Sequence, residues 1–121
     1  MKEVAAKLKL FFSSFGLSAY TRQNVPDEVE IPYIAYDLVE PRWDRQGNMN
    51  CQVYYPKKHV EELLTKADEI KAAIGYGLQI TMSEGYIMLY LADLQGQQET
   101  DEMTDSVIIS ILINVYHQPG M

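Results

Sequence analysis

The stretch from Val107 to Tyr116 has the strongest strand pattern in this chain. β-Branched residues occupy every second position of it, and the positions between them hold mixed residue types. The β-branched set is Val107, Ile109, Ile111, Ile113 and Val115. Successive side chains of a strand point to opposite faces of its sheet, and β-branched residues favour strands. The pattern therefore predicts a long strand over 107–116 with one strongly apolar face.

A second strand is predicted at Ile31–Glu40, and Pro32 marks its start because proline cannot donate to a ladder. Apolar residues fall on both of its faces, which favours an inner strand with a helix on one side and a partner surface on the other. The residues Met49–Tyr55 alternate apolar and polar types, as expected for a strand with one buried face. Together the two stretches predict a hairpin over 31–56.

Two stretches predict helices because their apolar residues recur every three or four positions. The first helix is expected over Lys2–Phe15, within an N-terminal segment 1–16, and Gly16 is its stop. Its apolar stripe is Val4, Leu8, Phe11 and Phe15. The second helix is expected over 58–74, with the stripe Val60, Leu63, Leu64, Ala67, Ile70 and Ile74. Each stripe is expected to pack on a sheet.

The remainder, 78–117, is expected to hold three strands. Leu78–Met82 predicts a short strand, a turn at 83–85 follows, and Tyr86–Leu94 predicts a strand buried on both sides. The residues 95–105 are expected to form a long polar loop, which is unusual in a compact domain and is therefore either functional or mobile. A further short strand is possible at Ser18–Thr21.

The expected order is helix, two strands, helix, three strands. This order predicts an α+β fold, with a single mainly antiparallel sheet of about five strands and two helices packed on one face. A chain of 121 residues with 47% hydrophobic and 22% charged residues suits one folded domain, 1–121.

Composition narrows the possible function. The formal net charge of −7 argues against gripping nucleic acid, because phosphate binding needs clustered lysine and arginine. The single cysteine excludes an internal disulfide and a cysteine-based zinc cage, and it suits a reducing compartment. No apolar run is long enough to span a bilayer, so a cytoplasmic protein without membrane partners is expected.

Candidates for catalysis are few, and we predict no catalytic, cofactor-binding or metal-binding residues. Cys51 lies on the apolar face of its predicted strand, where a buried small hydrophobe is a better interpretation than a nucleophile. His59 and His117 lack the spacing of a metal site. A small enzyme remains an alternative, with carboxylates and a histidine gathered at one end of the hairpin. Those residues are Asp37, Glu40, Asp44 and His59.

Several stretches resemble the tail terminator proteins of long-tailed bacteriophages and prophages, also called tail completion or minor capsid proteins. The stretches are Ile31–Leu38, Tyr54–Leu63, Lys66–Ile70 and the run Thr104-Asp105-Ser106 that leads into Ile108–Tyr116. The similarity covers about 26–117. In that family arginines often follow the acidic residue before the last strand. Here Asp105 is followed by serine, valine and isoleucine, so the role of those arginines is not carried over.

The resemblance implies a structural protein and not an enzyme. It implies a ring of copies, expected to be a homo-hexamer, at the head-proximal end of the tail tube, where it ends tube polymerisation and joins tail to head. Its partners would be itself, the tail-tube protein and the head connector protein, and DNA would pass through without specific binding. The protein would lie in the cytoplasm of the bacterial host during assembly and then in the virion tail. A small-molecule-binding or regulatory domain is the alternative from another class.

Two groups of residues are assigned as hypotheses under this interpretation. An acidic loop facing the ring lumen or the tube would contain Glu99, Asp101, Glu102 and Asp105. A subunit interface would contain Tyr33, Tyr36, Arg42, Trp43, Asp44 and Arg45, because tryptophan and arginine are common interface anchors.

Overall fold

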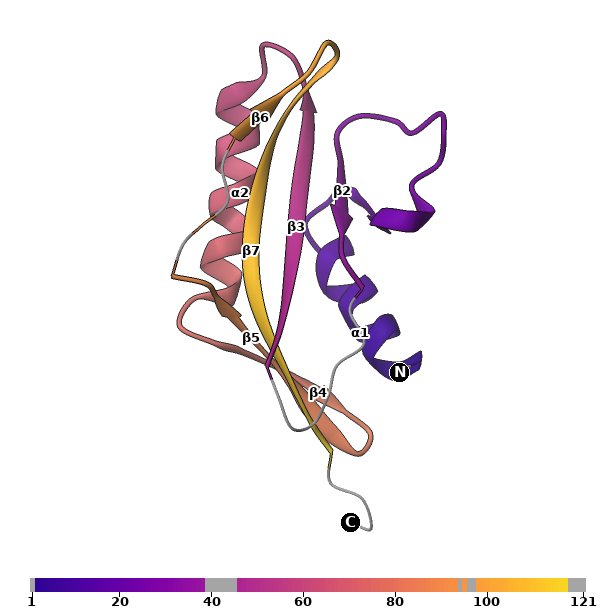
Figure 1. The fold of residues 1–121 in the computed structure, drawn as a ribbon, viewed down its shortest axis with the longest axis vertical. Coiled ribbons are helices and arrows are strands. Elements are labelled where there is room, and N and C mark those ends of the chain that lie inside the picture. Colours follow the sequence, from indigo (N-terminus) through magenta and orange to yellow (C-terminus); the bar gives the residue numbers. More distant parts are fainter. Residues whose placement is uncertain (1, 39–45, 94, 96–97, 118–121) are drawn as a thin grey trace.

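A computed structural model describes residues 2–38, 46–93, 95 and 98–117. Figure 1 shows a curled sheet with two helices. In chain order the elements are α1 (Lys2–Ser13), β1 (Ser18–Thr21), a 3-10 helix (Arg22–Asn24), β2 (Tyr33–Tyr36), β3 (Gly47–Pro56), α2 (Val60–Ile74), β4 (Leu78–Met82), β5 (Gly85–Leu91), β6 (Gln98–Thr100) and β7 (Thr104–His117). The predicted α+β class is confirmed. No helix in the described ranges is long and apolar enough to cross a membrane.

Strand β7, which the pattern of β-branched residues predicts as a long strand, is the centre of the sheet. The strand order is β1-β2-β3-β7-β5-β4, and β6 also pairs with β7. β3 runs antiparallel along one side of β7, with Cys51 opposite Ile109, and β5 and β6 share the other side. β1 and β2 are parallel, whereas the remaining pairs are antiparallel. The predicted pairing of the two strands within 31–56 is therefore confirmed.

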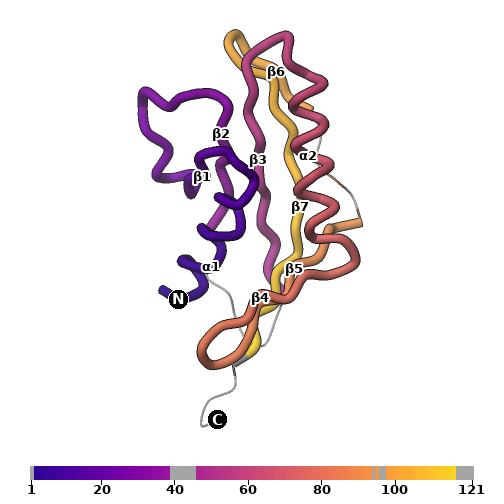
Figure 2. Tube along the Cα trace, turned by 180° about the vertical axis from the view of Figure 1, so that it is seen from behind, coloured from indigo at the N-terminus to yellow at the C-terminus, as the bar shows by residue number. Residues whose placement is uncertain are grey.

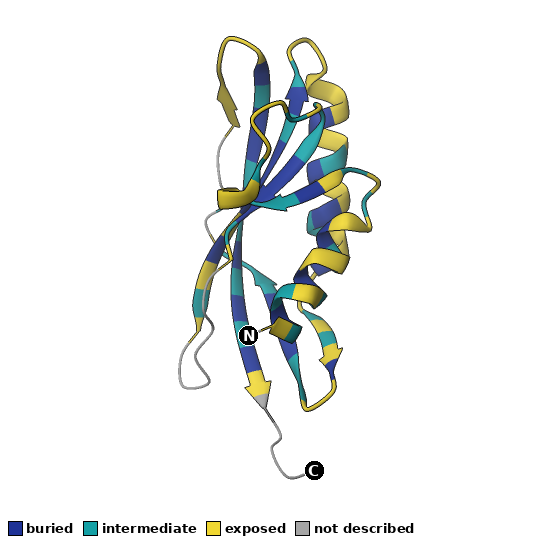
Figure 3. Ribbon diagram, turned by 90° about the vertical axis from the view of Figure 1, so that its right-hand side faces the viewer, coloured by how far each residue is buried: buried dark blue, intermediate teal, exposed yellow. Residues whose placement is uncertain are grey.

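Both helices cover one face of the sheet, which curls around them (Figures 2 and 3). α2 packs on β3, β7 and β5, while α1 packs on β1 and on β4, the two outermost strands of the order. One helix can contact both outer strands only if the sheet is strongly curved. Glu3 of α1 fixes this closure, because its carboxylate accepts hydrogen bonds from the backbone N–H and the hydroxyl of Ser83, at 3.0 and 2.8 Å.

The core lies between the helices and the concave face of the sheet. Every residue of the predicted β-branched set is buried, and so are the core-facing residues of β3. The buried residues of β3 on that side are Met49, Cys51, Val53 and Tyr55. α1 contributes Val4, Leu8 and Phe12, and α2 contributes Leu63, Ala67, Ile70 and Ile74. Most of each predicted stripe therefore faces the sheet, but Val60 and Leu64 are exposed, and Phe12 is the buried aromatic residue of α1 while Phe11 and Phe15 are only partly buried.

Three expectations about strands are wrong. β2 has four residues, not about ten. The sheet has seven strands, because β1 joins it and β6 forms inside the expected polar loop 95–105. β5 is buried on one face only, since Ile87 and Leu89 are buried while Met88 and Tyr90 are half-buried. No helix of the described chain packs on the second face of β5, although its apolar sequence suggested a second covering layer.

Candidate interaction face

The face of the sheet turned away from the helices is the candidate functional surface. Among the described residues no helix covers it, and Figure 3 shows both helices on the other side. Alternation along the strands brings polar side chains of β3 and β7 to this face, together with most of the tyrosines of the strands. We call it the open face.

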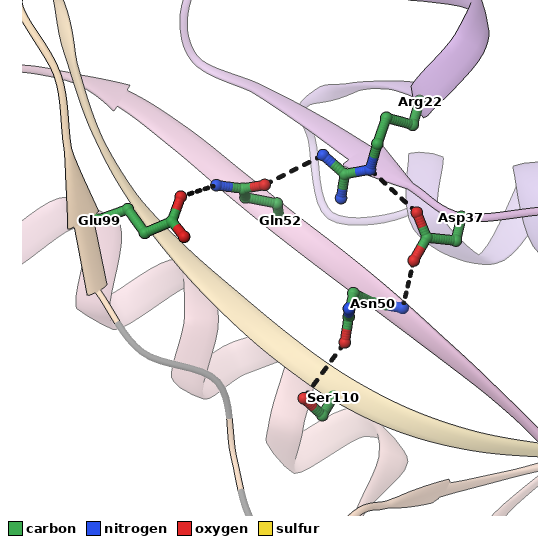
Figure 4. Close-up of polar contacts among 6 residues, drawn as sticks. All are labelled: Arg22, Asp37, Asn50, Gln52, Glu99 and Ser110. Atoms are coloured by element: carbon green, nitrogen blue, oxygen red, sulfur yellow. Dashed lines mark hydrogen bonds and ion pairs between the residues drawn. The ribbon is translucent and has the colours of Figure 1, made fainter.

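Gln52 is the centre of a hydrogen-bond network on the open face (Figure 4). It is only 5% exposed although it lies outside the helix-covered core. Its side-chain oxygen accepts a hydrogen bond from Arg22 Nη1 at 3.0 Å. Its nitrogen donates to Ser106 Oγ at 2.8 Å and to Glu99 Oε2 at 3.3 Å. The amide thus joins the 3-10 helix, β3, β6 and β7. Both its oxygen and its nitrogen are hydrogen-bonded within the chain.

Arg22 extends this network to the edge of the sheet. Its Nε lies 2.9 Å from Asp37 Oδ1, and Asp37 Oδ2 accepts the backbone N–H of Asn50 at 3.0 Å. Asn50 in turn accepts a hydrogen bond from the Ser110 hydroxyl at 3.2 Å. Burial opposes the charge of Arg22, but Asp37 and the Tyr54 hydroxyl raise its guanidinium pKa above the ordinary value. The positive charge is therefore held in place and neutralised within the chain.

Tyrosine pairs flank the network at the two ends of the open face. Tyr33 stacks on Tyr54 with ring centroids 4.6 Å apart, and Tyr20 meets Tyr33 edge-on at 6.3 Å. At the other end, Tyr86 stacks on Tyr116 at 4.8 Å. Burial and then the neighbouring Tyr54 hydroxyl raise the pKa of Tyr33, so the hydroxyl stays neutral at physiological pH. These rings present rigid apolar area with polar tips, which is the composition of many protein interfaces.

The four predicted acidic residues lie on a hairpin formed by β6 and β7. Glu99 faces the open face and binds Gln52, and Asp105 accepts a hydrogen bond from Thr100 at 2.6 Å. Asp101 closes the turn. Its carboxylate accepts hydrogen bonds from the backbone N–H groups of Met103 and Thr104, both at 2.8 Å. These backbone donors lower the pKa of Asp101. Glu102 is exposed. Three of these carboxylates therefore have structural partners, unlike the side chains of an unstructured loop.

The predicted interface residues do not all lie on one surface. Tyr33 is half-buried on the open face, as an interface residue can be. Tyr36 is 1% exposed and stacks on Phe12 of α1 at 4.5 Å. Tyr36 is therefore a core residue and not an interface residue, because alternation along β2 turns it to the helices. The other four predicted interface residues, 42–45, lie outside the described residues.

Of the residues of the enzyme alternative, the structure describes Asp37 and His59, and these two have different partners. Asp37 is paired with Arg22, whereas His59 lies 3.0 Å from Glu62 at the start of α2. Glu40 and Asp44 lie outside the described residues. Cys51 is fully buried, and this burial raises the pKa of its thiol. Within 2–38, 46–93, 95 and 98–117, no group of three or more acidic, histidine or cysteine side chains is placed to hold a metal ion.

Sequence reasoning missed Arg22 and Gln52. Gln52 occupies an alternating polar position of β3, where a solvent-exposed side chain is expected, and its partner Glu99 is distant in sequence. The one available indication was the place of Gln52 in a strand with strands on both sides, because the side chains of such a strand have many neighbours.

In comparisons with protein families, curated proteins and solved structures, no family model, protein or structure matches this chain.

Proposed function

We propose that this chain is a structural assembly protein, a tail terminator that forms a ring at the head-proximal end of a phage or prophage tail tube. There it ends tube polymerisation and joins the tail to the head. The observation that carries the proposal is the open face, a sheet surface of stacked tyrosines and half-buried aliphatic residues with no covering layer in the described chain. The resemblance along 26–117 supports the same assignment.

The composition of the open face supports association between proteins. Its network is internally satisfied, because Arg22 and Asp37 neutralise each other and Gln52 has polar partners. A satisfied network can be covered by another protein surface at less cost than unpaired charges. The tyrosines beside it are already ordered by stacking, which lowers the conformational entropy lost on association. This face is therefore suited to contact other subunits.

Net charge supports the role of a passage for DNA. Each copy carries a formal charge of −7, and a hexamer would carry six times that charge before counterions bind. A lumen of this sign repels phosphate and does not retain the duplex. Under the proposal, the β6–β7 hairpin with Glu99, Asp101, Glu102 and Asp105 faces the lumen or the tube.

The test is the mass in solution, measured by light scattering over a concentration series, with negative-stain images of the most concentrated sample. A hexamer has a mass of about 83 kDa, six times 13.9 kDa, and a central hole. Replacing Tyr86 and Tyr116 by serine should shift the series toward the monomer. Tyr76 is fully exposed in the turn after α2, so Tyr76→Ser is the matched control and should leave the mass unchanged. A monomer at every concentration, alone and with tail-tube protein, would contradict the proposal.

A further inference from the structure

The sheet is one strand narrower at the β6 end than at the β5 end. The C-terminal half of β7 pairs with β5, which pairs in turn with β4. The N-terminal end of β7 pairs with β6, and no strand of the described chain lies beyond β6. The sheet therefore has a notch beside β6, next to the N-terminal half of α2 (Figure 1).

The backbone of β6 turns hydrogen-bonding groups into this notch. The Asp101 N–H donates to the Thr104 carbonyl at 2.9 Å, so this pair closes the hairpin. In an antiparallel ladder the hydrogen-bonded pairs alternate, so Glu99 is the next residue bonded to β7. Gln98 and Thr100 therefore direct their N–H and C=O groups outward. A free edge of this kind is a template for pairing with another strand.

A hollow of about 310 Å³ with both apolar and polar walls lies beside this edge. It is lined by Val60 and Leu63 of α2, by β6 and by the start of β7. Val60 is 43% exposed, and Leu64, one turn further along the same side of α2, is 41% exposed. Val60 lines the hollow and is partly exposed there, so a further strand would cover it.

Most of the charges around the notch are negative: four carboxylates lie there, together with one cation, Lys57, whose backbone N–H donates to the Met103 carbonyl at the hairpin turn. Glu99 projects to the open face, Asp105 lies on the helix side, and Asp101 and Glu102 form the tip of the hairpin. A residue added directly opposite Glu99 would share its face of the sheet, where opposite charges stabilise a cross-strand pair. Charge complementarity therefore favours a basic residue at that position.

The outer strand β1 is packed against α1 of its own chain. The Lys9 ammonium of α1 donates to the carbonyl of Ala19 in β1. Covering an outer strand with a helix is a common way to prevent edge-to-edge pairing. A second copy would also bring its own net charge of −7 to an acidic notch. Both observations favour a different, basic partner over another copy of this chain.

We propose that β6 is a docking edge for an extended segment of a partner protein, which adds to the sheet as one more strand. The residue of that segment opposite Glu99 is lysine or arginine. Its two neighbours are aliphatic, point to the helix side, and fill the hollow against Val60 and Leu63. This proposal goes beyond the ring and does not depend on it, because a single copy of the chain carries the whole notch.

The test is a titration of the ¹⁵N-labelled protein with the capped peptide Ac-Thr-Val-Lys-Val-Thr-NH₂, followed by NMR. The amide signals of Gln98 and Thr100 should shift together and saturate. The same peptide with glutamate in place of lysine should bind more weakly, by up to about fivefold. In Glu99→Lys the preference should reverse. A peptide N-methylated at the valines and a peptide N-methylated at the lysine should differ in affinity, since an added strand turns only alternate N–H groups to the edge.

Val60→Ala tests the hollow without altering the hairpin and should weaken binding of the lysine peptide. Leu10→Ala is its matched control, since Leu10 is an exposed aliphatic residue of α1 and should have no effect. The proposal is overturned if neither Gln98 nor Thr100 responds at millimolar peptide. It is also overturned if the lysine and glutamate peptides bind equally, or if Val60→Ala and Leu10→Ala behave alike. Concentration-dependent protection of those two amides without peptide would assign the edge to a second copy and reject a foreign partner.

Discussion

The two faces of the sheet are built from the same strands but are stabilised differently. On the helix face, β3 and β7 present apolar side chains apart from Asp105 near the start of β7, and nearly all of the apolar ones are buried to within a few per cent. On the open face, the same two strands present Gln52, Asn50 and Ser106, which hydrogen-bond to partners from distant parts of the chain. One face is held by burial, and the other is held by hydrogen bonds and stacked rings.

This difference shows how a strand can specify a core and a surface at once. Apolar packing on the helix face needs only residues of the right size and hydrophobicity. The open face needs particular partners, because a buried amide without a hydrogen bond destabilises the fold. Substitutions should therefore act by different rules on the two faces, and adjacent residues of one strand allow matched comparisons.

The largest effect is expected at Ile109, which is fully buried on the helix face of β7. Ile109→Ala should lower the free energy of unfolding by about 2–5 kcal/mol, through lost burial and the cavity left behind. Ile108→Ala is the control, because Ile108 is the same residue type on the open face and only half-buried. Urea unfolding of both variants measures the difference. Equal losses would show that the open face is as well covered as the core.

The second effect concerns the buried amide of the open face. Gln52→Ala should lower the free energy of unfolding by about 1–3 kcal/mol, because the buried Ser106 hydroxyl loses its hydrogen-bond partner. Asn50→Ala is the matched change on the same face of the same strand, but Asn50 is exposed, and its effect should be smaller. Urea unfolding again provides the measurement, and a larger loss for Asn50→Ala would contradict the role given to Gln52.

A smaller coupling is expected between the stacked rings Tyr33 and Tyr54. A double-mutant cycle to alanine should give an interaction free energy of about 0.5–1.5 kcal/mol, the range for aromatic pairs. The cycle with Tyr86 and Tyr116 samples the same type of contact at the other end of the face. A coupling near zero in both cycles would mean that the rings do not stabilise the single chain, and that their ordering has to come from association.

The helix face could be predicted from the sequence, and the open face could not. Alternation along 107–116 and the helical stripes at Val4, Leu8 and Leu63 identify core residues by period alone, because burial depends on local pattern. The network around Gln52 depends on which strands become neighbours. Glu99 and Arg22 reach it from strands and loops that pairing brings together, and no local pattern encodes that pairing.

The same limit explains the errors in strand length. β2 ends after Tyr36, although the apolar pattern continues beyond it, since ladder pairing and not residue type decides where a strand stops. β6 was missed because Gln98–Thr100 has no apolar face, and it becomes a strand only by pairing with β7. Of the candidate site, the acidic residues and Tyr33 were predicted, whereas their hydrogen-bond partners were not.

The smallest effect is a pH dependence at the tip of the hairpin. The pKa of Asp101 is lowered in the folded chain by the backbone N–H groups of Met103 and Thr104. A lowered pKa stabilises the fold above the unfolded value, about 3.9, and that contribution disappears as the pH falls through the folded pKa. Asp101→Asn cannot ionise, so its unfolding free energy should fall below that of the unmodified chain near pH 6 and approach it at acidic pH.

Urea unfolding of the unmodified chain and Asp101→Asn, at several pH values between 6 and 2, measures this change. Glu102→Gln is the control, because it removes a charge from the same turn without removing a hydrogen bond seen in the described chain. Its difference from the unmodified chain should stay nearly constant over that range. If both variants show the same pH dependence, the effect comes from the net charge of the acidic hairpin and not from the hydrogen bonds of Asp101. The hairpin would then be ordered by its pairing with β7 alone.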